Sequence, residues 1–139
     1  MARGDVVLRV PTLMVAFEAE QADGKLKIAG PIGVTFPPRL PHEFAPLVAM
    51  VIENPHPEVA TTKVRIEIAR SDGAVLPDSV RDHTIRWSPG FQAGAPAFIY
   101  VIDSVTATFG TEGAYTVRVL IDDDPTPRAI TSFGVFLTN

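Results

Sequence analysis

The chain of 139 residues contains no cysteine. Disulfides, thiol catalysis and thiolate metal sites are therefore excluded, and the composition suits a reducing cytoplasm, where we expect the protein to act. Long apolar runs are missing too, since no stretch approaches the ~18 residues that cross a bilayer. The N-terminal residues include Pro11 and acidic side chains instead of the apolar block of a secretory signal. We therefore expect no membrane association.

Basic side chains are scarce relative to acidic ones. Twelve Lys and Arg stand against 16 Asp and Glu, which gives a formal net charge of −4. Proteins that bind nucleic acid neutralise phosphates with clustered Lys and Arg, and no basic run occurs here. We expect no nucleic-acid partner.

The residues that are present indicate strands. Hydrophobic residues make up 46% of the chain, and 13 Pro and 10 Gly are scattered between short apolar runs. Such regular punctuation is typical of β-sandwiches and barrels. No repeat, linker or convincing helix interrupts the pattern. We predict one domain over residues 1–139, an all-β, immunoglobulin-like antiparallel sandwich of about eight or nine strands.

The stretch EAEQADGKLKIAG at residues 18–30 predicts a hairpin. Apolar residues alternate on both sides of Gln21-Ala22-Asp23-Gly24, which we take as a four-residue loop. The register that puts opposite charges on one face and apolar side chains on the other has four facing pairs: Glu20 with Lys25, Glu18 with Lys27, Ala19 with Leu26, and Phe17 with Ile28. Ile32, Val34 and Phe36 continue the inward row, and Gly30-Pro31 bends or bulges the strand.

Five further segments carry strand patterns. Residues 47–53 are apolar on both faces and predict a central strand, whereas residues 63–70 alternate cleanly. Residues 80–87 alternate weakly, which favours an edge strand. Residues 97–102 predict another buried strand. An inward row is expected at Tyr115, Val117, Val119 and Ile121.

Two resemblances point to the same fold. FGTEGAYTVRV, residues 109–119, resembles the tyrosine-corner segment of immunoglobulin-like domains, with Gly113 two residues before Tyr115. ADGKLKIAGPIGVTF and the late F-x-x-x-G-x-Y resemble a widespread group of small uncharacterised bacterial proteins. That resemblance implies an immunoglobulin-like sandwich along most of the chain, and it implies no activity.

No catalytic or metal constellation stands out. His42, His56 and His83 are far apart and lack a paired metal spacing. Asp122-Asp123-Asp124 is dense enough to suggest calcium, but a solvated hairpin tip explains it better, because Asp favours turns. Asp82 and Thr84 share a strand face without the histidine between them, so they form no triad. We expect no enzyme, no cofactor and no metal.

The residues most suited to partner contact lie around the segment SPGFQAGAP. Trp87, Phe91 and Gln92 are the candidates, because exposed aromatic side chains anchor partners at low entropic cost. The alternative for Trp87 is that it ends an inward row with Ile85. We expect a non-enzymatic interaction or structural subunit that binds a protein partner, or a second copy, through an edge strand, for example in a larger bacterial or phage assembly. A small-ligand or carbohydrate-binding module using the loop aromatics is the alternative.

Overall fold

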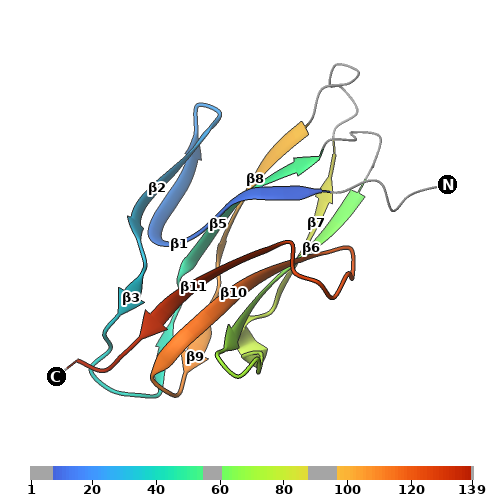
Figure 1. Cartoon of the computed structure of the whole chain (residues 1–139). Helices are drawn as coiled ribbons and strands as arrows, with labels where there is room; N and C mark the ends of the chain where they lie inside the picture. Colours follow the sequence, from blue (N-terminus) through green and yellow to red (C-terminus); the bar gives the residue numbers. More distant parts are fainter. Residues whose placement is uncertain (1–7, 55–60, 88–96, 139) are drawn as a thin grey trace.

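A computed structural model describes residues 8–54, 61–87 and 97–138 (Figure 1). These residues form strands and one 3-10 turn, Pro77–Ser79, and none of them lies in an α-helix. The prediction of an all-β fold is confirmed. None of the described residues belongs to a helix with the length and apolarity that a bilayer span requires.

Two sheets form the sandwich. The four-stranded sheet is antiparallel and has the order β2 (Lys25–Pro31), β1 (Arg9–Ala22), β5 (Leu47–Asn54), β8 (Ala97–Ser104). The five-stranded sheet has the order β3 (Val34–Thr35), β11 (Ala129–Val135), β10 (Gly113–Ile121), β6 (Thr61–Arg70), β7 (Arg81–Arg86). Its strands are antiparallel except that β3 runs parallel to β11. A third, small pair joins β4 (His42–Phe44) to β9 (Ala107–Phe109).

The structure describes eleven strands, and the eight longest account for the predicted eight or nine. Eight of the described strands have six or more residues, and the other three, β3, β4 and β9, have two or three.

The core lies between the sheets and is built from the predicted inward rows. On β6 the row is Val64, Ile66 and Ile68, and on β10 it is Tyr115, Val117, Val119 and Ile121, all at most 3% exposed. Each fully buried large apolar side chain stabilises the fold by about 1.5–3 kcal/mol. Glu67 faces away from this core and is nevertheless buried, with only 9% of its surface exposed. Nη2 of Arg118 lies 2.6 Å from its Oε1. The ion pair compensates the charge of the buried Glu67, whereas the Nε of Arg118 is buried without a hydrogen-bond partner.

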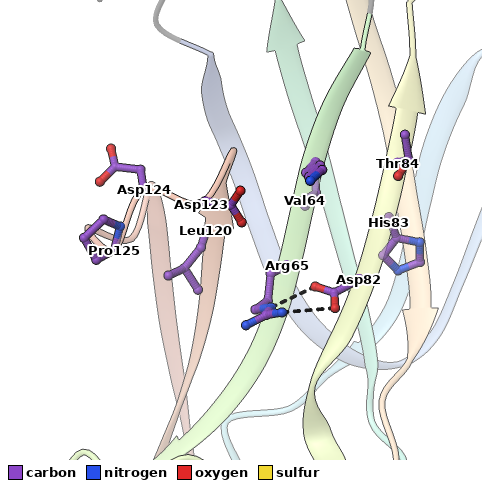
Figure 2. A pocket seen from close by; sticks show the side chains of 10 residues that line it. Val64, Arg65, Asp82, His83, Thr84, Leu120, Asp123, Asp124 and Pro125 are labelled. Carbon is purple, nitrogen blue, oxygen red and sulfur yellow. Dashed lines mark hydrogen bonds and ion pairs between the residues drawn. The ribbon is translucent and has the colours of Figure 1, made fainter.

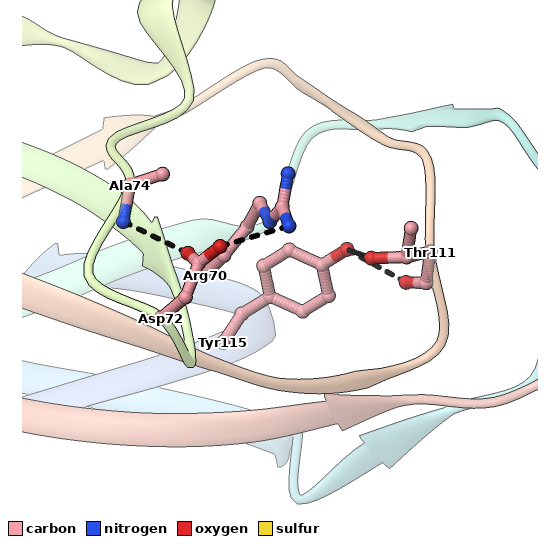
Figure 3. Close-up of polar contacts among 5 residues, drawn as sticks. All are labelled: Arg70, Asp72, Ala74, Thr111 and Tyr115. Carbon is pink, nitrogen blue, oxygen red and sulfur yellow. Dashed lines mark hydrogen bonds and ion pairs between the residues drawn. The ribbon is translucent and has the colours of Figure 1, made fainter.

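The tyrosine corner is present (Figure 3). Tyr115 is buried, and its hydroxyl donates a 2.7 Å hydrogen bond to the carbonyl of Thr111, four residues earlier. The bond ties the loop before β10 to the strand itself. The resemblance of this segment to immunoglobulin-like domains is therefore matched in its local geometry.

The β1–β2 hairpin forms, but its predicted register is wrong. The turn has two residues, Asp23 and Gly24, both with positive φ (52° and 70°), as a type I′ turn requires. This shorter turn moves each pairing by two residues. Glu20 faces Lys27 and Glu18 faces Ala29.

The second half of β1 turns away from the core. Residues 9–16 pair with β5 and residues 16–22 pair with β2, so β1 changes partner at Ala16. Figure 1 shows the hairpin rising beside β5 and β8. The hydroxyl of Tyr100 on β8 donates a 2.8 Å hydrogen bond to the carbonyl of Gly24 at the tip. Phe17, predicted to face inward, is 59% exposed because it lies beyond this bend.

The predicted inward row after β2 is also partly wrong. Gly30 has φ +65°, which bends the strand as expected, and Ile32 is buried. The chain then crosses to the five-stranded sheet as β3. Val34 and Phe36 are 43% and 59% exposed. Val34 pairs with Gly134, whose neighbours Phe133 and Val135 are buried, so the side chain of Val34 lies on the outer face of that sheet. Because the chain changes sheet here, residues that alternation places inward, Val34 and Phe36, are exposed instead.

Candidate functional site

Trp87 does not lie on the surface, so its assignment as a partner-contact residue is wrong. It is 7% exposed and continues the inward row of Ile85. Its indole N–H donates a 2.8 Å hydrogen bond to the hydroxyl of Thr62, which is itself buried. Trp87 is therefore a core residue and is not available to stack on a ligand. Phe91 and Gln92, the other two candidates, lie outside the described residues.

The sandwich has four strands at the ends of its two large sheets, namely β2, β8, β3 and β7. A strand at a sheet edge presents unpaired backbone groups, and natural proteins protect it with charge, proline or short length. Three of these edges carry such protection. β2 has Lys25, Lys27 and Pro31, and β3 has only two residues and is soon followed by Pro37 and Pro38.

β7 is the third protected edge. The prediction that residues 80–87 form an edge strand is confirmed, because β7 ends the five-stranded sheet. Its six residues include Arg81, Asp82 and Arg86. Charged side chains are a common protection of natural edge strands, so this sequence discourages pairing with an apolar strand.

β8 is different. It has eight residues, AFIYVIDS, without Lys, Arg, Pro or Gly, and it ends the four-stranded sheet. The prediction of a buried strand at residues 97–102 is therefore wrong. Phe98 is 53% exposed, and Ile99 and Val101 are only half-buried although they face the core. Their partners on β5, Ile52 and Met50, are fully buried.

Two polar contacts hold β8 in place from both of its faces. On the inner face, Asp103 Oδ2 lies 2.6 Å from His83 Nε2 on β7, so this pair joins the edges of the two sheets. On the outer face, Tyr100 holds the hairpin tip. Among the described strands, β5 pairs with β8 along its whole length, and β1 makes only limited contact with it. The candidate functional site is this edge, beside which the structure describes no further strand.

A depression of about 490 Å³ lies on the outer face of the five-stranded sheet (Figure 2). Arg65 and Asp82 on its floor form a bidentate pair, with Nε–Oδ1 2.8 Å and Nη2–Oδ2 3.2 Å. This hydrogen bonding to Arg65 lowers the pKa of Asp82, and the pKa of Arg65 is raised in turn. Because the two charges satisfy each other, neither is left to select a ligand.

The acidic turn at the rim of this depression is the predicted hairpin tip. Asp122 and Asp123 have φ of 50° and 63°, and Asp122 Oδ1 accepts a 2.8 Å hydrogen bond from the backbone N–H of Lys63. Asp124 pairs with Arg128 at 3.3 Å. The carboxylates of Asp122 and Asp124 therefore have structural partners. In the part of the chain that the structure describes, no three His, Asp or Glu side chains are grouped so that they could hold a metal ion, and His56 lies outside that part.

A solved structure shares this fold. The chain matches the Pseudomonas fluorescens alkylpurine DNA glycosylase AlkC bound to DNA containing an abasic site analog, with a TM-score of 0.50 and 15% identity over 93% of this chain. The match covers 30% of the glycosylase chain. It contradicts the prediction that the chain is not an enzyme, because this fold forms part of an enzyme's chain. At this identity the likeness shows the fold alone and transfers no catalytic residue.

A second solved structure is the CARDB domain of the PF1109 protein of Pyrococcus furiosus, in complex with di-metal ions. It matches with a TM-score of 0.44 and 16% identity over 94% of this chain and 97% of that domain. No curated protein matches. The model of a family of unknown function, DUF6941, matches residues 12–131, which is most of the chain. The chain therefore belongs to this family of unknown function, DUF6941.

Proposed function

We propose that the protein is a protein-binding domain that accepts a β-strand from its partner at the free edge of β8. The observation that carries the proposal is the contrast between β8 and the other three sheet edges. β2, β3 and β7 each carry Lys or Arg, proline or short length, whereas the one charged residue of β8 is Asp103 near its end, which pairs with His83. A long apolar edge invites another strand, because backbone hydrogen bonds and side-chain burial are gained together.

The side chains of β8 suit such a partner on both faces. Phe98 is 53% exposed on the outer face, and Ile99 and Val101 are half-buried on the inner face. An added strand would cover part of each. Burial of the remaining apolar surface would stabilise the complex by about 25 cal/mol for each Å² removed from water. The expected partner segment is extended, alternating and apolar, with few charges.

This proposal moves the docking edge from β7, where the sequence pattern placed it, to β8. It retains the wider expectation of an immunoglobulin-like interaction or structural subunit acting in the cytoplasm. A larger bacterial or phage assembly is one setting in which such a subunit would work. The cysteine-free composition supports the reducing compartment.

The test uses the full chain as bait in native cell extract, with Phe98→Lys as the variant and Phe36→Lys as its matched control. The two phenylalanines have similar exposure, 53% and 59%; Phe98 lies on β8, and Phe36 directly follows β3 of the other sheet. Both variants should fold, because neither side chain is in the core. We expect partners to be retained by the wild type and by Phe36→Lys, and lost by Phe98→Lys, because a lysine is a common protector of an edge strand.

Hydrogen exchange on the purified complex locates the contact. Amides of residues 98–103 should exchange more slowly in the complex than in the free chain, since pairing protects an edge that was open. Retention of every partner by Phe98→Lys, or unchanged exchange over these residues in a complex, would overturn the proposal.

A further inference from the structure

We propose that one partner of β8 is a second copy of this chain, paired antiparallel through β8 about a two-fold axis at Tyr100. The inference deepens the proposed function and rests on it. It depends on the sequence of the strand and on where its charges lie.

The apolar part of β8 is self-complementary. Phe98, Ile99, Tyr100, Val101 and Ile102 form an unbroken uncharged run whose midpoint is Tyr100. In a two-fold antiparallel pair centred there, each residue faces the one equally far on the other side of the midpoint. Phe98 then faces Ile102 of the second copy, and Ile99 faces Val101. Large apolar side chains oppose each other on both faces.

The charges agree with this register. Asp103 is the first charged residue of the strand, and it faces Ala97 of the second copy when the axis passes through Tyr100. No like charges oppose each other between Ala97 and Asp103. The edge strand β7 has charges at Arg81, Asp82 and Arg86 and offers no comparable uncharged run. Self-pairing is therefore favoured at β8 specifically.

Each copy contributes the residues of a single strand to the pair. A standard stable interface has about 20–30 residues per side, so this interface is small. We therefore expect a weak dimer with a dissociation constant in the micromolar range. Two four-stranded sheets would join into one continuous eight-stranded sheet across the pair.

The first experiment measures mass by sedimentation over a concentration series. Phe98→Lys should raise the dissociation constant roughly tenfold or more, because the Phe98–Ile102 pair occurs twice in each dimer. Phe36→Lys should leave it unchanged. Phe98→Lys combined with Ile102→Glu should recover much of the loss, since the new opposite charges face each other only across the axis. Within one chain they stand four residues apart on the same strand.

The second experiment uses the absence of cysteine in the chain. In Tyr100→Cys the two new thiols lie directly opposite each other, at the about 4.5–5.5 Å Cα separation of facing residues, which is compatible with a disulfide. Mild oxidation should therefore produce a covalent dimer. Phe98→Cys, whose thiol faces Ile102, is the control and should remain largely uncrosslinked.

A wild-type chain that stays monomeric at high concentration, or equal crosslinking of the two cysteine variants, would overturn self-pairing about Tyr100. Failure here is distinguishable from failure of the proposed function. If self-pairing fails and Phe98→Lys still releases another protein from the bait, β8 is a docking edge for a different chain. If neither result is obtained, both proposals fall.

Discussion

Replacing each of the two tyrosines by phenylalanine compares the loss of a part-buried hydrogen bond with the loss of an exposed one. Tyr115 is 2% exposed, and its ring packs edge-on against Phe109 with centroids 4.8 Å apart. The substitution Tyr115→Phe keeps that ring contact and removes the hydroxyl that donates to the Thr111 carbonyl. The matched change Tyr100→Phe removes a hydroxyl that bonds the Gly24 carbonyl at 2.8 Å, at an exposed site.

The two substitutions should differ in cost. A hydrogen bond contributes about 0.5–1.5 kcal/mol net, and at this part-buried site its loss also leaves an acceptor without its partner. We therefore expect Tyr115→Phe to lower the free energy of unfolding by about 1–1.5 kcal/mol. For a chain of 139 residues this corresponds to a fall in Tm of about 3–5 °C. Water can replace the hydroxyl of Tyr100 at the hairpin tip, so Tyr100→Phe should cost less than about 0.5 kcal/mol.

Urea unfolding followed by circular dichroism measures both values, at a protein concentration low enough to keep the chain monomeric. The slope with denaturant should be the same in all three proteins, because the surface exposed on unfolding is unchanged. Equal costs for the two substitutions, or a cost below about 0.5 kcal/mol for Tyr115→Phe, would refute the assignment of Tyr115 as the corner that holds the loop to β10.

Three further predictions concern other parts of the fold. The only tryptophan, Trp87, is 7% exposed, so native fluorescence should be blue-shifted and resist iodide quenching, and a red-shifted, readily quenched emission would contradict its burial. In double-mutant cycles with charge reversal, Glu20 and Lys27 should couple by about 0.2–1 kcal/mol, whereas Glu18 and Lys27 should couple less, because Glu18 faces Ala29. Stronger coupling of Glu18 than of Glu20 to Lys27 would instead support the register of the four-residue loop. Because Arg65 lowers the pKa of Asp82, the pair's stabilisation should be present above the unfolded carboxyl pKa of about 3.9 and be lost as pH falls through the lower folded value. In Asp82→Asn the free energy of unfolding should fall slightly less steeply as the pH is lowered, and the effect should be small because the pair is exposed. The same pH dependence in the wild type and in the variant would mean that the pair contributes no stability in solution.

The sequence by itself determined the local structure. Period-two alternation placed the inward rows of β6 and β10, because successive side chains of a strand point to opposite faces. Gly113 and Tyr115 marked the tyrosine corner, and the Asp-rich segment at residues 122–124 marked a turn, since Asp tolerates the left-handed region. Each of these features depends on neighbours in the chain.

The tertiary structure decided what depends on distant partners. The hairpin register follows from the two-residue turn at Asp23 and Gly24, and alternation alone suited the four-residue loop equally well. Trp87 is buried because Thr62 lies opposite the end of its strand and accepts its N–H. β8 has the apolar pattern of a central strand and nevertheless lies at a sheet edge, because strand order is set by pairing between segments far apart in the sequence. The local sequence of β8 is equally compatible with a central strand and with an edge strand. Its free side follows from the strand order, in which the structure describes no further strand beside β8.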